Sequence, residues 1–344
     1  MTGLATGIGH PASDQVRAGW LQSLRTLYVL PEEFRTDDTD WTTALRMLGC
    51  GEQLLRELMA AGLRHTPGPD GPLFDWHDLH NLALYSGSGS SQPERGMRFA
   101  LRWMGAAPET WTEPVSWRFE AELSCPHPHS GTYDWSLAEP IPALYGGESQ
   151  VVTTDAVEVR DGYLTASGIE AFHHTAELRT AGISDRIRSP ELREILLSYS
   201  SPDYRWLRLP HALQVKTDLV LSQHGVTCVA SSLDLAARCR AAGYPARTRI
   251  GWMLGLLDLR HAWIEVTDDD GVVKVADPVF GRLADLTDDV QPGFREACLG
   301  STFTRLLPTA LEADTPLTSH RCGAAVVEPV RNLRLRMREP AGGA

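Results

Sequence analysis

Three side chains that can carry out covalent chemistry together occur in the order Cys228, His261 and Asp277. A thiolate is a nucleophile, an imidazole can take its proton and later protonate a leaving group, and a carboxylate can hold the imidazole in one tautomer. Taken singly, each residue has a commoner explanation, namely a core cysteine, a structural histidine and an Asp-Pro turn. Brought together by the fold, the three residues predict acyl chemistry on a thiol.

The sequence after Cys228 predicts a helix over residues 228–242. Apolar residues recur on one side of this segment, and Gly243 and Pro245 then end the helix. Cys228 would therefore be its first residue. A thiol at a helix N-terminus lies near free backbone N–H groups and the positive end of the helix dipole, and both favour the thiolate. Cys239, on the same helix, is expected to be a core residue.

A hairpin is predicted to position the other two residues. Residues 261–266 read as a strand, residues 268–271 as a turn and residues 272–276 as the returning strand. This pairing places Asp277 near the start of the first strand, beside His261. The predicted helix and hairpin thus bring thiol, imidazole and carboxylate within reach of one another.

The motifs in this segment resemble a known family. Gly-x-x-Cys, Ala-Gly-Tyr-Pro-Ala-Arg, His-Ala-Trp-x-Glu-Val and Asp-Pro, within residues 200–283, are similar to the core of the transglutaminase-like superfamily of papain-type cysteine enzymes. The resemblance implies a Cys228–His261–Asp277 triad and an α+β fold, with the Cys-bearing helix packed on an antiparallel sheet. It also gives residues 245–247 a structural role, as the turn into the first core strand.

Acyl transfer on a thiol also needs an oxyanion hole. One donor is expected to be the backbone N–H of Cys228. In relatives the second donor is often an upstream Trp or Gln side chain, for which Trp206 and Gln223 are the candidates. Nothing in the sequence decides between them, and either residue is equally compatible with a core or surface position.

The remaining sequence predicts two domains and a tail. Residues 1–135 are expected to form a mainly helical N-terminal domain, with helical periodicity over residues 40–63 and a strand over residues 115–123. This domain resembles no family. Residues 148–330 are the expected catalytic domain, and residues 331–344 are expected to be a short, frayed basic tail.

Composition limits the partners. The chain has 344 residues, with 32 Lys and Arg against 44 Asp and Glu, for a formal net charge of −12. Such a charge disfavours nucleic acid and anionic membranes as partners. No segment approaches the about 20 apolar residues of a membrane helix, and no secretory signal is apparent, so a cytoplasmic protein is expected. Its six cysteines form no CxxC pairs, which argues against a disulfide framework.

A metal site was considered at two places. His77 and His80 are three residues apart in a predicted helix, and Cys125, His127 and His129 lie in a Pro-rich loop. Their spacing matches no zinc pattern, and the two groups are far apart in the sequence. A structural role is therefore favoured for these residues, and neither a metal nor a cofactor is expected.

The resemblance suggests what reaction the triad performs. Some members of the superfamily act in bacterial natural-product pathways on acyl groups held by carrier proteins. The leading hypothesis is therefore amide formation between an acyl or aminoacyl thioester, bound to an acyl or peptidyl carrier protein, and an amine. Docking of an acidic carrier requires a local basic patch, to which Arg238, Arg240, Arg247 and Arg249 could contribute.

Two other classes of function compete with the acyltransferase. A cysteine peptidase or amidase, such as the leader peptidases of lasso-peptide maturation, has a similar Cys and His-Ala-Trp core, although those proteins are usually much shorter. A pseudoenzyme that retains only the fold ranks last, because all three triad residue types are present. The core motifs alone do not separate hydrolysis from aminolysis, since the choice of acceptor depends on the flanking walls.

Overall fold

The computed structural model describes residues 14–126, 133–254 and 259–338. The chain divides into two compact units, one of Met1–Phe99 with Arg205–Thr227 and one of Ala100–Tyr204 with Cys228–Ala344. This division differs from the single boundary expected between residues 135 and 148. A short segment that returns to an earlier unit leaves no mark in composition, so the sequence alone does not reveal it. None of the helices in the described ranges has the length and apolar character of a membrane span.

The first unit combines helices with a small sheet. Its N-terminal helices are α1 (Asp14–Arg25), η1 (Glu32–Phe34), α2 (Trp41–Leu48), α3 (Glu52–Ala60), α4 (Trp76–Leu84) and the start of α5 (Gln92–Leu101). Its sheet has the order β1-β3-β2, with β1 (Asp37–Thr39), β2 (Thr66–Gly68) and β3 (Gly71–Asp75). Trp20, Leu55 and Leu82 are among the residues of its apolar core. The helical periodicity of residues 40–63 belongs to two helices, because Gly49 ends α2 in the left-handed conformation.

The returning segment completes the first unit. It comprises β10 (Arg205–Trp206), α7 (His211–Gln214), α8 (Thr217–Leu221) and β11 (Gly225–Val226). β10 and β11 pair in parallel. The segment is held to the N-terminal part of the unit by Asn81, whose side-chain amide donates to the Arg208 carbonyl and accepts from the Arg208 N–H. Both expected oxyanion side chains, Trp206 and Gln223, lie in this segment.

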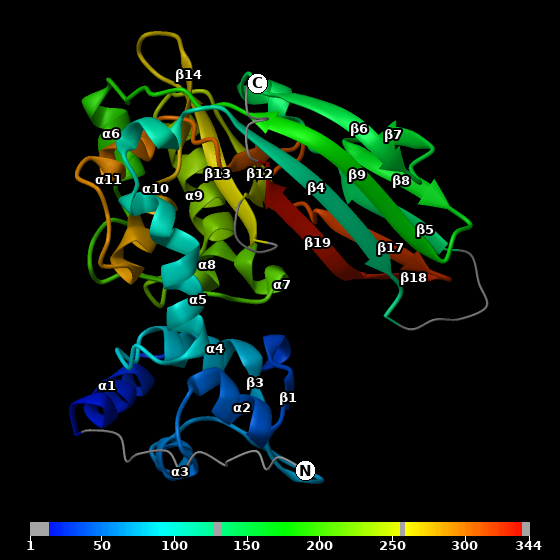
Figure 1. Ribbon diagram of the computed structural model, residues 1–344. Helices are drawn as coiled ribbons and strands as arrows, with labels where there is room; N and C mark the ends of the chain where they lie inside the picture. Colours follow the sequence, from blue (N-terminus) through cyan, green and yellow to red (C-terminus); the bar gives the residue numbers. More distant parts are fainter. Residues whose placement is uncertain (1–13, 127–132, 255–258, 339–344) are drawn as a thin grey trace, which may run out of the picture. The chain divides into compact units, whose positions relative to one another are not determined.

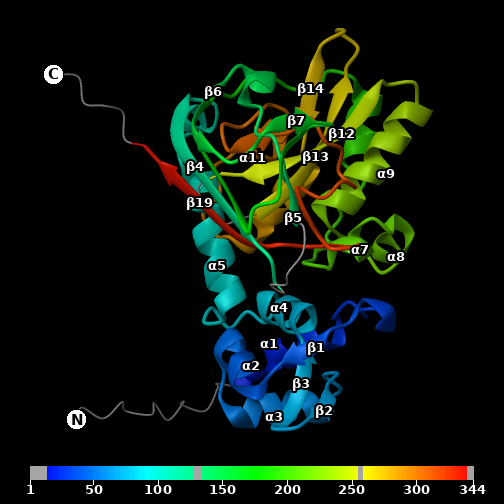
Figure 2. The ribbon, with the colours of Figure 1, turned by 90° about the vertical axis from the view of Figure 1, so that its right-hand side faces the viewer.

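The second unit carries Cys228, His261 and Asp277. Its first sheet is antiparallel, in the order β15-β14-β13-β12-β16. The strands are β12 (Ala246–Met253), β13 (Leu259–Thr267), β14 (Val273–Ala276), β15 (Leu299–Gly300) and β16 (Leu306–Pro308). α9 (Cys228–Ala241) packs against β12 and β13 (Figures 1 and 2). The predicted helix and hairpin are therefore present, with β13 starting two residues before His261.

Short helices surround this sheet in the second unit. They are η2 (Arg102–Gly105), η3 (Pro108–Trp111), η4 (Pro142–Tyr145), α6 (Pro190–Leu196), α10 (Pro278–Leu283), η5 (Ala284–Leu286) and α11 (Phe294–Ala297). Trp103 and Trp111 pack edge-on against Phe294, with ring centroids 5.3 and 5.1 Å apart. The sequence on both sides of the segment from Cys228 to Asp277 thus contributes to one aromatic core.

Two further sheets of the second unit lie in two layers (Figure 1). One has the order β19-β4-β9-β6, with β4 (Val115–Ser124), β6 (Glu148–Thr154), β9 (Ala171–Thr180) and β19 (Val330–Met337). The other has the order β18-β17-β5-β8-β7, with β5 (Tyr133–Ala138), β7 (Glu158–Arg160), β8 (Tyr163–Ser167), β17 (Thr318–Cys322) and β18 (Ala325–Val327). Alternate residues of β4, β5 and β9 are buried, as expected for sheets packed face to face.

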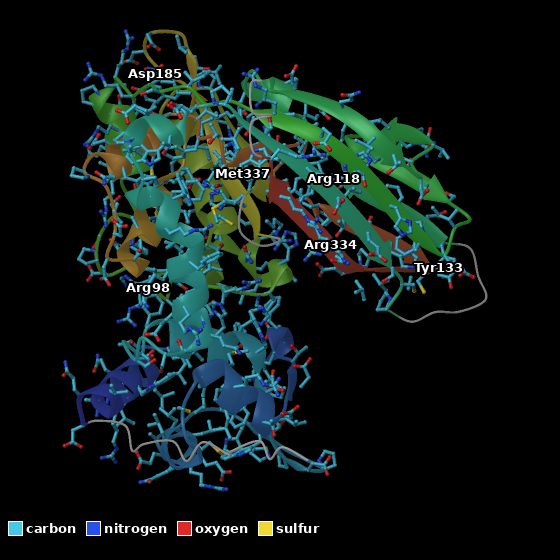
Figure 3. The ribbon with its side chains drawn as sticks, viewed as in Figure 1. Arg98, Arg118, Tyr133, Asp185, Arg334 and Met337 are labelled. Carbon is cyan, nitrogen blue, oxygen red and sulfur yellow. The ribbon has the colours of Figure 1, made fainter. Side chains whose placement is uncertain are left out.

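The expected frayed tail is wrong for most of its length. Residues 330–337 form β19, which pairs with β4 from Val330 opposite Ser124 to Met337 opposite Trp117. Figure 3 labels Arg334 and Met337 on this strand and Arg118 on β4. Leucines alternate with arginines along β19, and this period of two is typical of a strand with one face packed. The many arginines of this segment led to the prediction of a basic tail instead of a strand.

A buried ion pair fixes β12 to β13, the strand that carries His261. Arg249 donates through Nε and Nη2 to the Glu265 carboxylate, at 3.0 and 2.7 Å, and both side chains are only 4% exposed. Tyr145 donates from its hydroxyl to Glu265 and accepts from the Trp263 indole N–H, both at 2.6 Å. The side chains of Trp263 and Glu265 are thereby locked on the strand that also carries His261.

Replacement of Arg249 tests how much this ion pair stabilises the second unit. Arg249→Met leaves the Glu265 carboxylate buried without its main partner, which costs roughly 3 kcal/mol of unfolding free energy. Arg247→Met is the matched control, since Arg247 also pairs with Glu265 at 2.6 Å but its side chain is 58% exposed, so the cost is below about 1 kcal/mol. Denaturant unfolding of both variants measures the difference, and equal costs would contradict this ranking.

Candidate active site

Cys228 lies where the sequence predicts, as the first residue of α9. Its N–H is one of the four at the start of the helix that have no partner within the helix. Cys228 is 9% exposed, His261 4% and Asp277 1%, so the three side chains form a buried cluster. The Cys228 sulfur is hydrogen-bonded to His261 and to the backbone N–H of Ala262, and it lies in the field of Arg260.

His261 is held on two sides. Its Nε2 lies 2.5 Å from Oδ2 of Asp277, which leaves Nδ1 as the ring nitrogen available to Cys228. The ring of Phe280 stacks on the imidazole with centroids 4.4 Å apart and planes 6° from parallel. The hydrogen bond to Asp277 and the stacking of Phe280 therefore together fix the orientation of the imidazole ring.

Asp277 also begins a helix. Its Oδ1 accepts from the Phe280 N–H at 3.1 Å and caps α10, in which Pro278 occupies the first position. Its own N–H donates to the Cys298 carbonyl at 2.8 Å. The Asp-Pro turn expected as the ordinary explanation of this residue is thus present as a helix cap. Because the cap uses one carboxylate oxygen, the other is free to face His261.

Electrostatics favour the ion-paired form of the cluster. Burial alone would raise the pKa of the Cys228 thiol, but hydrogen bonding to His261 and the charge of His261 outweigh burial and lower that pKa. Burial opposes protonation of His261 as well, yet the charge and hydrogen bond of Asp277 raise the pKa of the imidazole well above its ordinary value. Hydrogen bonding and charge thus shift this cluster toward the thiolate–imidazolium pair.

The other thiols are in different surroundings. Burial raises the pKa of Cys50 and of Cys239 to about 11. Burial, together with the nearby charge of Asp277, raises the pKa of Cys298 still further. As expected, Cys239 is fully buried in the core. Of these four thiols, only that of Cys228 has a lowered pKa.

The two oxyanion side-chain candidates differ in their engagement within the first unit. The amide of Gln223 is committed to Val29, accepting from its N–H at 3.1 Å and donating to its carbonyl at 3.2 Å. Trp206 is half-buried, and its backbone carbonyl accepts from the hydroxyl of Tyr85 at 2.7 Å. Gln223 thus uses its side-chain amide in these hydrogen bonds, whereas the hydrogen bond at Trp206 involves its backbone.

The metal candidates from the sequence do not group as considered there. His80 is buried beside Trp76, and burial lowers its pKa to about 3, so it is a neutral core residue. The Nδ1 atom of His77 lies 3.6 Å from Oδ1 of Asp75. Cys125 instead groups with His320 and Cys322. His127 and His129 lie outside the described residues.

One of the four arginines expected to contribute to a docking patch, Arg249, is buried. Arg249 is buried and paired with Glu265, and Arg247 pairs with the same carboxylate. Arg238 lies 3.8 Å from Asp234, and Arg240 donates to the Ala246 carbonyl. Arg249 is therefore unavailable to a partner, whereas a docking role for the three exposed arginines stays a prediction.

Sequence reasoning missed three groups that position the cluster. Phe280 stacks on His261, the Ala262 N–H faces the sulfur, and Tyr145 anchors the His261 strand through Trp263. The position of Phe280 could have been inferred from the sequence. It is the third residue after Asp277, and the carboxylate of an N-cap residue accepts a hydrogen bond from the N–H at that position. Tyr145 lies far upstream, and nothing in the sequence links it to the catalytic segment.

Comparison with known proteins adds little to this geometry. The chain matches no family model and no curated protein. A solved structure from Cytophaga hutchinsonii, provisionally named a cysteine protease, is 11% identical, with a TM-score of 0.39 over 67% of this chain and 93% of that one. At this score, neither the fold nor the activity of this chain follows from the likeness.

Thiol alkylation tests the activation of Cys228. At mildly acidic pH, iodoacetamide is expected to modify Cys228 before the other five thiols, because the thiolate is the reacting form. Peptide mapping after short exposure locates the label, and Cys239→Ala serves as a control that removes a buried, inactive thiol. His261→Ala is expected to slow labelling of Cys228 at this pH. Equal labelling of several cysteines in the folded protein would contradict an activated thiolate.

Proposed function

We propose that this protein is a cysteine-dependent acyltransferase of the transglutaminase-like class, with Cys228 as nucleophile, His261 as acid and base, and Asp277 as the orienting carboxylate. The observation that carries the proposal is the buried cluster in which Asp277 holds His261 beside a thiol of lowered pKa. The motifs around the three residues and the packing of α9 on an antiparallel sheet support assignment to this class.

In the first half-reaction the thiolate attacks the carbonyl carbon of the donor. The new bond joins the Cys228 sulfur to that carbon, and the carbonyl electrons move to the oxygen. The backbone N–H of Cys228, at the start of α9, is one donor to this oxyanion. When the tetrahedral intermediate collapses, the leaving group takes the proton of the His261 imidazolium, and the acyl group remains as a thioester.

In the second half-reaction an amine attacks the thioester. His261, now neutral, accepts the proton that the amine loses as the carbon–nitrogen bond forms. The carbon–sulfur bond then breaks and Cys228 leaves as a thiolate. The amide departs, and the thiolate–imidazolium pair is restored.

Burial supports transfer to an amine over hydrolysis. Cys228, His261 and Asp277 are each less than one-tenth exposed, so bulk water has little access to a thioester at Cys228. We infer that the acceptor is bound by the protein and displaces water. Cysteine peptidase or amidase activity is the alternative, in which water replaces the amine in the second half-reaction.

The donor is proposed from the resemblance of the motifs. Relatives in bacterial secondary metabolism use acyl or aminoacyl thioesters held on carrier proteins, and a thioester donor suits a thiol nucleophile because thiol exchange has a small energetic cost. The acceptor is then an amine. This assignment concerns the substrates alone, and the chemistry proposed for Cys228 does not depend on it.

Intact-protein mass spectrometry separates acyl transfer from hydrolysis. Wild type and Cys228→Ala are incubated with a panel of acyl-pantetheine and carrier-bound thioesters, first without and then with amines. We expect a mass adduct on wild type alone, discharged as an amide when amine is added. Cleavage of peptides that requires Cys228, with no adduct from any thioester, would instead favour the peptidase.

Substitution of the triad tests the assigned roles. Cys228→Ala and His261→Ala are expected to abolish turnover while leaving the far-ultraviolet circular dichroism unchanged. Asp277→Asn is expected to reduce kcat by about 100- to 10,000-fold, because the imidazole loses the carboxylate that orients and charges it. Full activity in Cys228→Ala would refute the mechanism.

The pH profile of kcat/KM should reflect the two shifted groups. The active thiolate–imidazolium form exists above the lowered pKa of Cys228 and below the raised pKa of His261. Activity is therefore expected to stay on a plateau through neutral pH, falling on the acid side as the thiolate is protonated and on the alkaline side as His261 loses the proton needed by the leaving group. Asp277→Asn should move the alkaline limb to lower pH. An unchanged limb in that variant would contradict the role of Asp277.

A further inference from the structure

Two cysteines from different sheets meet at one end of the two-layer region of the second unit. Cys125 directly follows β4, and Cys322 is the last residue of β17. Their sulfur atoms lie 3.5 Å apart, although the residues are 197 positions apart in the sequence. No local sequence pattern connects the two residues.

Strand periodicity directs both thiols into the space between the sheets. Leu123 is buried in β4, and a period of two places Cys125 on the same face. His320 is fully buried in β17, and Cys322, two residues later, shares its face. Tyr133, labelled in Figure 3, begins β5 and pairs with Cys322 in the register. The thiols and the imidazole therefore converge from opposite layers.

His320 has a ring nitrogen without a partner. Its Nδ1 lies 3.2 Å from the carbonyl oxygen of Asp134, to which it is placed to donate. Its Nε2 is buried and has no hydrogen-bond partner within the part of the chain that the structure describes. Trp135 stacks on the imidazole, with centroids 3.9 Å apart, and fixes its plane. A buried polar atom left in this way costs free energy unless something binds it.

We propose that Cys125, His320 and Cys322 bind a zinc ion that joins the ends of the two sheets. The ligand atoms of the three residues all lie within 4.8 Å of one another. Two thiolates on one tetrahedral Zn²⁺, with bonds of about 2.3 Å, lie about 3.8 Å apart, close to the spacing of these sulfurs. A water molecule or another donor completes the tetrahedron.

The ligand types and their support select this class of metal. Thiolates with imidazole favour zinc among the common divalent ions, whereas calcium and magnesium require oxygen ligands. A histidine that binds metal ordinarily donates its other ring N–H to a carbonyl or carboxylate, which fixes the tautomer. His320 meets this condition through the Asp134 carbonyl. The site contains none of the proposed triad residues, so the ion takes no part in the chemistry proposed for Cys228.

Metal titration of the full-length protein tests the site. The protein is stripped with a chelator, kept reduced with a non-thiol reductant, and titrated with Co²⁺ alone and then with Zn²⁺. We expect one Co²⁺ per chain, with the visible absorption of a tetrahedral site and a thiolate-to-metal charge-transfer band. Zn²⁺ should displace it and bleach both signals. Absence of a thiolate-bound Co²⁺ in the reduced wild type would overturn the proposal.

Variants locate the ion. Cys125→Ser, Cys322→Ser and His320→Gln are each expected to weaken Co²⁺ binding by at least about 100-fold, since loss of an outer partner alone costs 10- to 100-fold. Cys228→Ala and Cys50→Ser should retain the wild-type spectrum, which excludes the proposed nucleophile and an unrelated thiol as ligands. Wild-type affinity in folded Cys322→Ser would refute the site. So would a Cys125–Cys322 disulfide in protein that takes up no metal after reduction.

Discussion

The contact between His261 and Asp277 is the constraint on which the candidate active site depends. One carboxylate oxygen caps α10 and the other lies 2.5 Å from the imidazole, so a local helix cap fixes the partner of a residue on another strand. The same carboxylate raises the pKa of His261, and the charged imidazole lowers the pKa of Cys228. Without Asp277, burial would favour a neutral thiol and a neutral imidazole, and the nucleophile would be lost.

The rest of the second unit keeps this contact in place. His261, Trp263 and Glu265 are two residues apart and share one face of β13. Tyr145 anchors Trp263, and Arg249 anchors Glu265. α9 packs on the same sheet and presents Cys228 at its first turn. Side chains that take no part in the chemistry thus set the strand and the helix whose spacing determines whether sulfur and imidazole meet.

Local sequence patterns made much of the site predictable. Pairings between residues far apart in the sequence could not be predicted. The helix after Cys228, the hairpin of residues 261–276 and the position of Asp277 follow from periodicity, turn residues and short connections. Tyr145, the pairing of β19 with β4 and the meeting of Cys125 with Cys322 depend on tertiary contacts that leave no local pattern. The burial of Arg249 was unpredictable for the same reason, since only the fold places it beside Glu265.

Ultraviolet titration of the thiolate tests the central claim most directly. Thiolates absorb in the ultraviolet where thiols do not, so the difference between wild type and Cys228→Ala reports the ionisation of this one residue. We expect a thiolate in wild type at neutral pH that is lost only on acidification well below the ordinary pKa of cysteine, and that is absent at neutral pH in His261→Ala. A wild-type spectrum that matches Cys228→Ala throughout the neutral range would contradict the account.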